Sequence, residues 1–194
     1  MTQTDPYAQF AAWFAEAEKT EVNDPNAMTL ATATPAGLPS ARIVLLKGWD
    51  AEGFIFYTNR TSQKGAELAA NPHAFLLFHW KSLRRQVRIA GPVEQVSDAE
   101  SDEYYQSRPR GSRLGAWASL QSSTLPARDD LLRRVAALEA QYPGETPIPR
   151  PPHWGGYRVR PTEFEFWQDM PFRLHDRSVH TRTKSGWAVS KLFP

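Results

Sequence analysis

The sequence predicts a mainly β protein, an antiparallel barrel with helices inserted at its periphery. Apolar and β-branched residues gather in many short segments, turn residues such as Pro35-Ala36-Gly37 separate these segments, and only a few stretches repeat apolar residues at helical spacing. Many short strands combined with few helices are typical of closed or nearly closed antiparallel sheets. The 194 residues, 41% of them hydrophobic, suffice for one packed domain over residues 1–194.

The expected helices are marked by local capping signals. Asp5-Pro6 precedes apolar residues at helical spacing and predicts a helix over residues 5–21. Ser62 is expected to cap a short helix before Asn71-Pro72, and Ser97 and Glu100 have the spacing of a capping box. That helix is expected to stop near residue 107, before Pro109. A last amphipathic helix is expected to present Leu131, Leu132, Val135 and Leu138.

The expected strands fill most of the remaining chain. They cover residues 28–34, 41–49, 54–58, 73–80, 84–96, 157–161, 163–168, 173–182 and 187–193. The strands 73–80 and 84–96 are expected to form a hairpin around Lys81-Ser82. Five prolines in residues 143–152 predict a stiff loop that crosses the fold rather than a linker between domains.

Composition excludes several functions. Cysteine is absent, so disulfides, thiolate metal sites and cysteine nucleophiles are ruled out. A formal net charge of +2 gives no indication of nucleic-acid binding. The five histidines are spaced unfavourably for a shared metal, and no apolar run approaches the ~18 residues of a membrane span. No signal peptide is recognised at the start, and a cytoplasmic protein is expected.

Three clusters of cationic residues suggest a small anionic ligand. On a strand, Arg173, His175 and Arg177 project from one face, either toward an anion or as a charged edge strand. Arg42 and Lys47 flank an apolar strand, where parity places them on opposite faces unless a bulge or a subunit boundary intervenes. Tyr104 and Arg108 are four residues apart, and Ser112 follows at a helix start near Pro109, where free N–H groups suit a phosphate.

Taken together, these segments resemble the pyridoxine/pyridoxamine 5′-phosphate oxidase family. The segments that carry the resemblance are RIVLLK (42–47), FYTN (56–59), RQV (85–87), SRPRGSRLGAW (107–117), QSS (121–123), WGG (154–156) and EFWQDMPFRLHDR (165–177). The match runs in order along nearly the whole chain. It implies an FMN-binding split β-barrel with peripheral helices, assembled as a homodimer with FMN at the subunit interface.

The resemblance also implies roles for individual residues. It implies FMN contacts from Arg42, Ile43, Val44, Leu45, Leu46, Lys47, Tyr57, Thr58, Gln63, Lys64, Gln86, Gln121, Ser122, Trp167 and Arg177. It implies substrate contacts from Lys47, Tyr104, Arg108, Ser112, Arg173 and His175, of which Arg173 and His175 lie over the pyridine ring as the catalytic pair. The implied reaction is the oxidation of pyridoxamine or pyridoxine 5′-phosphate by O₂ to pyridoxal 5′-phosphate and hydrogen peroxide.

The chain departs from the family pattern at three places. Gln63 stands where the family usually has arginine, which removes one cationic contact to the flavin phosphate. The Arg-x-x-Tyr segment that closes over the substrate in longer members has no counterpart here. The stretch Asp169-Met170-Pro171-Phe172 before Arg173 is unusually apolar and is expected to reshape the pocket.

Two other functions stay open at the level of sequence. One is a flavin oxidase of secondary metabolism of the phenazine type, whose substrates lack a phosphate; the retained Lys47, Tyr104, Arg108 and Ser112 favour a phosphate ester instead. The other is a non-catalytic carrier of flavin or pyridoxal phosphate. The presence of Arg173 and His175, the pair implied to be catalytic, argues against a carrier.

Overall fold

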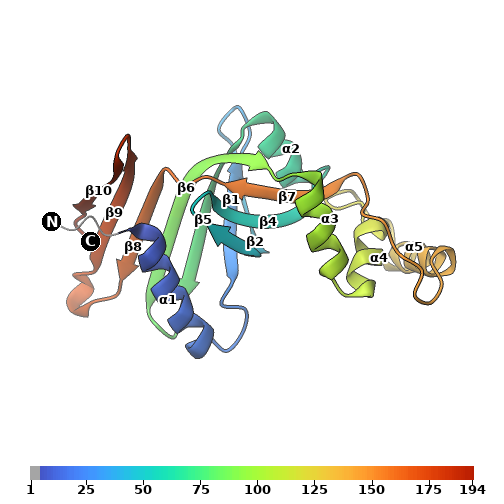
Figure 1. Cartoon of the computed structure of the whole chain (residues 1–194), viewed down its shortest axis with the longest axis horizontal. Coiled ribbons are helices and arrows are strands. Elements are labelled where there is room, and N and C mark those ends of the chain that lie inside the picture. Colours follow the sequence, from blue (N-terminus) through green and yellow to red (C-terminus); the bar gives the residue numbers. More distant parts are fainter. Residues whose placement is uncertain (1–4) are drawn as a thin grey trace.

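The protein is built on one curled antiparallel sheet, seen here in a computed structural model that describes residues 5–194 (Figure 1). The strands are β1 (Ala27–Ala33), β2 (Pro39–Leu45), β3 (Gly48–Asp50), β4 (Gly53–Asn59), β5 (His73–Trp80), β6 (Arg85–Gln95), β7 (Trp154–Val159), β8 (Glu163–Gln168), β9 (Asp176–Thr183) and β10 (Gly186–Lys191). The helices are α1 (Pro6–Thr20), α2 (Gln63–Ala70), α3 (Asp98–Ser107), α4 (Arg110–Ala118) and α5 (Arg128–Gln141).

Strand β6 belongs to two parts of the sheet at once. The main path runs β10-β9-β8-β6-β5-β1-β2, while β7 leaves it to pair with both β6 and β4. Arg85–Ala90 of β6 pairs with β8, and Val93–Gln95 pairs with β7. The change of partner falls at Gly91, where a Cβ atom would lie 1.9 Å from the carbonyl oxygen of Arg160. Only glycine allows this close approach of two backbones.

Helix α1 closes one side of the curled sheet with an aromatic cluster. The Asp5 carboxylate accepts a hydrogen bond from the Tyr7 N–H at 3.0 Å, as the capping signal predicts. Phe10 is fully buried and its ring lies 4.9 to 6.0 Å from the rings of Phe14, Trp49, Phe54, Phe78 and Trp80. This helix therefore anchors the core from outside the sheet.

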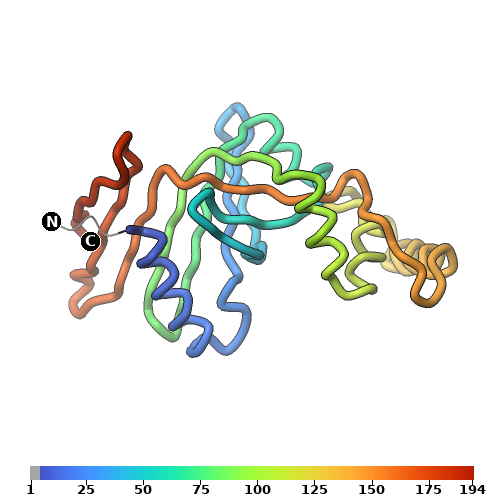
Figure 2. Tube along the Cα trace, viewed as in Figure 1, coloured from blue at the N-terminus to red at the C-terminus, as the bar shows by residue number. Residues whose placement is uncertain are grey.

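Helices α3, α4 and α5 form an insertion between β6 and β7, at the opposite end of the molecule from the β9–β10 hairpin (Figure 2). The proline-rich residues 143–152 return from this insertion without forming a helix or strand. Arg150 fixes the return loop, because its guanidinium donates to Asp102 at 2.6 Å and to Asp98 at 2.9 Å in α3. The Trp117 indole N–H donates to the Pro149 carbonyl at 2.7 Å.

Most of the elements expected from the sequence are confirmed. The helix predicted over 5–21 is α1, Ser62 and Ser97 cap α2 and α3 with their side chains, and β5 and β6 form the predicted hairpin. Helix α5 is also present, but none of its residues is buried in this chain. Within residues 5–194 no helix has the length and apolar character that a membrane crossing requires.

Two predicted strands are wrong in a way that matters for the site. The strand expected over 41–49 is interrupted, because β2 ends at Leu45 and β3 begins at Gly48. The strand expected over 173–182 begins only at Asp176, because Pro171–Arg173 forms a 3-10 turn. Phe172 and Arg173 both have positive φ, 58° and 64°, which an extended strand does not allow.

Removal of the Phe10 ring should destabilise the whole fold. Phe10→Ala deletes the residue on which α1 and four aromatic side chains of the sheet converge, and we expect a loss of about 3–5 kcal/mol of unfolding free energy. Urea unfolding of the purified protein measures this change, with Val22→Ala, an exposed apolar position, as the control. If Phe10→Ala lost less unfolding free energy than Val22→Ala, α1 would not anchor the core.

Candidate functional site

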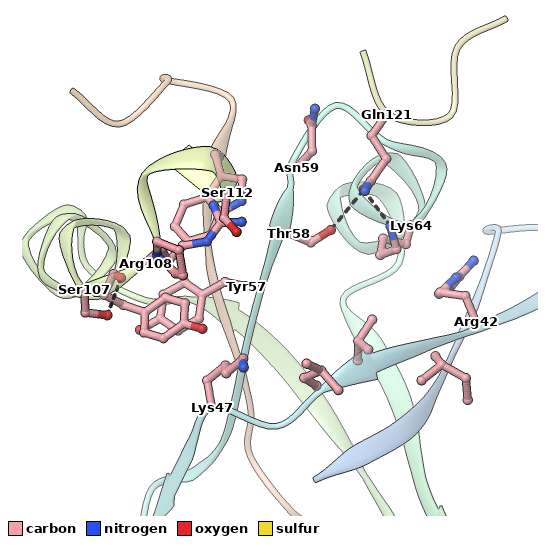
Figure 3. Close-up of a pocket in the computed structure, with 16 residues that line it drawn as sticks. Arg42, Lys47, Tyr57, Thr58, Asn59, Lys64, Ser107, Arg108, Ser112 and Gln121 are labelled. Carbon is pink, nitrogen blue, oxygen red and sulfur yellow. Dashed lines mark hydrogen bonds between the residues drawn. The ribbon is translucent and has the colours of Figure 1, made fainter. Parts of the chain in front are cut away.

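A cavity of about 890 Å³ opens where β2, β4, α2, α3 and α4 meet. Its lining within residues 5–194 includes four cations, Arg42, Lys47, Lys64 and Arg108, and no carboxylate. The four cations fall into two pairs, with Arg42 and Lys64 on one side of β4 and Lys47 and Arg108 on the other (Figure 3). Two separated pairs of cations provide places for two anionic groups.

Lys64 lies at the start of α2, where Ser62 caps the helix. Its ammonium group donates to the Ser62 hydroxyl at 3.3 Å. It also donates to the Gln121 side-chain oxygen at 2.8 Å, and Thr58 donates to the same oxygen at 3.2 Å (Figure 3). Burial lowers the pKa of Lys64, the neighbouring Arg42 lowers it further, and Glu67 acts in the opposite direction. An anion at this position would therefore stabilise a lysine charge that the protein alone compensates poorly.

Arg42 is held from behind by a buried carboxylate. The two terminal nitrogens of Arg42 donate to the Thr32 and Ser40 hydroxyls at 2.5 Å each, and Nη2 lies 3.3 Å from Glu67. Glu67 also accepts from Thr32, from Ser40 and, at 2.9 Å, from the Gln63 amide. Gln63, at the position where the resemblance implies an arginine, is thus engaged with Glu67 and does not line the cavity.

These hydrogen bonds keep Glu67 charged. Burial alone would raise its pKa, but hydrogen bonds from Ser40, Thr32, Gln63 and Arg42 outweigh that effect and lower the pKa to about 2. The Glu67 side chain is 8% exposed. The carboxylate therefore stays ionised and fixes Arg42 across the entire physiological range of pH.

An aromatic wall forms the opposite side of the cavity. The rings of Tyr57 and Tyr104 stack with centroids 4.0 Å apart, and Trp154 stacks on Tyr57 at 5.3 Å. The guanidinium of Arg108 lies 4.8 Å from the centroid of Trp154. Burial raises the pKa of Tyr57 to about 12, so that its phenol stays neutral.

Arg108 has a buried donor without a protein partner. Within residues 5–194 its Nη1 atom is shielded from solvent and makes no hydrogen bond. Burial lowers the pKa of this guanidinium, in keeping with a charge that lacks a counterion. Helix α4 begins next to it at Arg110, and Ser112 lines the same corner of the cavity. The predicted anion site near Pro109 thus has its cation, its hydroxyl and a helix N-terminus together.

Lys47 joins this side of the cavity because the chain leaves β2 before reaching it. The backbone N–H of Lys47 donates to the Ile55 carbonyl at 2.9 Å, outside both β2 and β3. The parity of a continuous strand therefore does not apply, and Arg42 and Lys47 both line the cavity. Neither the bulge nor the subunit boundary expected from the sequence is required, because β2 ends at Leu45 and Lys47 already pairs with Ile55 of β4.

A second group of predicted residues lies on the outer face of the sheet. Gln86 of β6, Trp167 of β8 and Arg177 of β9 are direct cross-strand neighbours. The adjacent Val87 and Phe166 are buried in the core, so the row Gln86–Trp167–Arg177 faces away from it. Four strand steps separate β2 from β8, roughly 19 Å along the sheet. One chain alone does not bring this row to the cavity.

Buried Glu165 orients Arg177 within this row. The Arg177 Nε and Nη2 atoms both lie 2.7 Å from Glu165 Oε1, while Arg88 binds the other carboxylate oxygen at 2.6 Å. Glu165 therefore anchors Arg177 from the next strand, much as Glu67 anchors Arg42.

Arg173 and His175 lie in the turn before β9, beside this row. The expectation that Arg173, His175 and Arg177 share one strand face is wrong, since β9 begins at Asp176. His175 packs on Trp167 with ring centroids 4.6 Å apart. Its Nδ1 atom lies 3.2 Å from the Met170 backbone N–H and 3.1 Å from Asp169 Oδ1. Both contacts fix the orientation of the imidazole ring.

The cavity thus gathers most of the residues that the sequence singled out, and adds some. It contains Arg42, Ile43, Val44, Leu45, Lys47, Tyr57, Thr58, Lys64, Tyr104, Arg108, Ser112 and Gln121. It does not contain Leu46, which is buried in the core, Gln63, Ser122, or the outer-face and turn residues Gln86, Trp167, Arg173, His175 and Arg177. Sequence reasoning missed Asn59, Ser107, Pro109 and Trp154, although all four belong to motifs that carried the resemblance. Within residues 5–194 no three potential metal ligands gather.

A curled antiparallel sheet with a cation-lined cavity beside an insertion of helices defines a split barrel of the FMN-binding class. The fold is shared with a pyridoxamine 5′-phosphate oxidase-related, FMN-binding protein from Nostoc punctiforme, with a TM-score of 0.77, 16% identity and full coverage of both chains. A TM-score of 0.93 and 34% identity relate it to PhzG from Burkholderia lata, solved with tetrahydrophenazine-1-carboxylic acid, over 100% of this chain and 94% of that one.

The sequence comparisons identify the family within this class. The family model described as Pyridoxamine 5′-phosphate oxidase matches residues 14–142, and the one described as Pyridoxine 5′-phosphate oxidase C-terminal dimerisation region matches residues 154–194. Curated pyridoxine/pyridoxamine 5′-phosphate oxidases are 60% identical in Gluconobacter oxydans, covering 99% of this chain and 96% of the relative, and 63% identical in Rhodospirillum rubrum, covering 98% and 96%. The chain belongs to the pyridoxine/pyridoxamine 5′-phosphate oxidase family.

The residues present fit FMN, the cofactor of this family. FMN carries a phosphate and a flat ring system, and the cavity offers the Arg42–Lys64 pair at one end and broad apolar and aromatic surfaces beside it. The poorly compensated charge of Lys64 is the observation that fits the phosphate.

The charge of Glu67 should contribute to the free energy of unfolding at neutral pH, and this contribution should disappear in acid. Because the folded-state pKa of Glu67 lies below its ordinary value of 4.5, its contribution is complete above that pH and is lost as the pH falls toward about 2. We expect Glu67→Gln to be less stable than wild type at pH 7 and to lose less stability between pH 5 and pH 3. Urea unfolding across this range measures both curves, and parallel curves would contradict the role of Glu67.

Proposed function

We propose that this protein, an FMN-dependent pyridoxine/pyridoxamine 5′-phosphate oxidase, forms each of its active sites from two subunits. The pairing of the cations in the cavity supports the reaction, because it suits two phosphates, one from the cofactor and one from a phosphate-ester substrate. The shared site is supported by the outward-facing residues of the C-terminal segment, described below. Arg42 and Lys64 would hold the FMN phosphate, and Lys47, Tyr104, Arg108 and Ser112 the substrate phosphate.

The protein's part in the reaction is to bind, orient and enclose. FMN held by these residues would supply the redox chemistry, a two-electron oxidation at the C4′ carbon of the substrate with O₂ as the final electron acceptor. The unpaired Nη1 of Arg108 would gain its missing acceptor from the substrate phosphate. Arg173 and His175 would face the pyridine ring and fix C4′ relative to the cofactor. With an amine substrate, water then hydrolyses the imine to the aldehyde and ammonia.

A second subunit is needed because the remaining predicted residues face outward. Trp167, Arg173, His175 and Arg177 all lie within residues 154–194, the segment that matches the family's dimerisation region. In a twofold dimer this segment of one subunit would close the cavity of the other. The dimer with FMN at its interface, the single-domain organisation over residues 1–194 and the cytoplasmic location remain predictions.

An absorption spectrum tests the proposed reaction directly. Anaerobic addition of pyridoxamine 5′-phosphate to the FMN-loaded protein should bleach the flavin band, and air should restore it with release of hydrogen peroxide. A flavin or pyridoxal phosphate carrier would bind without bleaching. The likeness to PhzG makes a phosphate-free substrate the alternative oxidase reaction, and bleaching by pyridoxamine but not by its 5′-phosphate would favour it.

Subunit complementation tests the shared site. Arg108→Ala removes a cavity residue and Arg173→Ala a turn residue, so each variant alone should lose most activity. In a mixed dimer, one of the two sites would combine an intact cavity with an intact turn. Random mixing of the unfolded and refolded variants should therefore restore about a quarter of the wild-type activity.

The same mixture also tests the alternative, in which each active site comes from a single chain. If each site comes from one chain, every site in the mixed dimer carries one defect and mixing restores nothing. A mixture of Arg108→Ala with Lys47→Ala, two residues of the same cavity, is the matched control and should stay inactive in either case.

A further inference from the structure

The turn that carries Arg173 holds a bulky aromatic residue in a strained conformation. Phe172 has φ 58° and ψ 20°, and Arg173 follows with φ 64°. The left-handed region is disfavoured for a bulky residue, and two successive non-glycine residues there are uncommon. Strain of this kind persists where the surrounding structure imposes it, often at a functional site.

No packing of the Phe172 side chain within residues 5–194 compensates for this strain. Its side chain is 91% exposed, and no ring contact joins it to another aromatic residue among residues 5–194. Met170 and Leu174 on either side are also exposed. A free aromatic ring on a strained backbone has no role in the stability of the isolated subunit.

The turn is nevertheless held firmly in place. The Asp169 N–H donates to the Arg84 carbonyl at 3.0 Å, and Arg84 forms an ion pair with the Asp169 side chain. The Met170 N–H donates to His175, and the Leu174 N–H donates to the Pro171 carbonyl at 3.2 Å. These contacts fix the backbone of the turn, and with it the direction in which the Cα–Cβ bond of Phe172 projects.

We infer that Phe172 covers the aromatic ring of the substrate in the partner subunit's cavity. This inference rests on the proposed function, which places Arg173 and His175 over the same ring. Phe172 is the direct neighbour of Arg173, with Cα atoms ~3.8 Å apart, so a site that receives Arg173 also receives Phe172. Ring-on-ring contact with a pyridine and exclusion of water from it suit an exposed phenyl group.

The test measures binding without turnover. Pyridoxal 5′-phosphate, the reaction product, is titrated into the FMN-loaded dimer, and its Kd is followed by the change in flavin absorbance. Phe172→Asn removes the ring and suits the left-handed backbone, so the variant should fold at least as stably as wild type. We expect its Kd and its KM for pyridoxamine 5′-phosphate to rise about tenfold, with FMN content unchanged.

Two further variants isolate the ring itself. Phe172→Tyr keeps the ring and should bind within about twofold of wild type. Phe193→Ala removes another phenyl ring of the same region that is 95% exposed, and should leave Kd unchanged. An Asn variant that binds like wild type would overturn the inference, and so would one that sediments as a monomer, because the ring would then pack on protein. Failure of the wild-type dimer to bind pyridoxal 5′-phosphate would reject the proposed function together with this inference.

Discussion

The close backbone approach at Gly91 is the constraint on which the rest of the architecture depends. There β6 stops pairing with β8 and begins to pair with β7, while the Arg160 N–H donates to the Pro92 carbonyl at 2.9 Å. The single strand thereby joins a long sheet to the smaller β3–β4–β7 group and curls one onto the other. This curl brings β4, with Tyr57 and Thr58, beside the end of β2 and creates the cavity between them.

Buried carboxylates organise cations in both groups of predicted residues, in the cavity and on the outer face of the sheet. Glu67 fixes Arg42 and Glu165 fixes Arg177, each through hydrogen bonds that leave the carboxylate on the protein side. Such pairs cost desolvation, but they hold a guanidinium in one orientation and leave no free anion in the cavity. Lys64 and Arg108 lack comparable partners, and burial lowers the pKa of both. The site is thus prepared for anions that arrive from outside.

Local signals in the sequence were sufficient for the elements that local interactions determine. Helix α1 follows from Asp5-Pro6 and the spacing of its apolar residues, and Ser62 and Ser97 cap their helices as expected. The break between β2 and β3 has no such signal, because the apolar run continues through Leu46, whose N–H still donates to the Asn26 carbonyl in the β1–β2 register. Only Lys47 changes partner, to the Ile55 carbonyl of β4. The positive φ of Phe172 and Arg173 likewise has no signal in the sequence, since neither residue type favours the left-handed region.

Most of the site residues came from the family resemblance, and the structure adds what a linear pattern does not contain. In the sequence, Glu67 is indistinguishable from any other carboxylate on a helix. Its contacts with Thr32 and Ser40, which are distant in sequence, make it a buried partner of Arg42. The separation of the cavity from the Gln86–Trp167–Arg177 row also required coordinates, because strand order sets it.

With the residue roles proposed above, the placement of the helical insertion separates the contacts to the FMN phosphate from the contacts to the substrate phosphate. Arg42 and Thr58 come from strands and Lys64 from the helix that follows β4, whereas Tyr104, Arg108 and Ser112 come from helices α3 and α4 and the short connection between them. Evolution can remodel that insertion, which meets the sheet through few strands, and exchange the substrate while the flavin-binding frame stays intact. A likeness of TM-score 0.93 to a protein solved with a phenazine carboxylic acid is consistent with such a division.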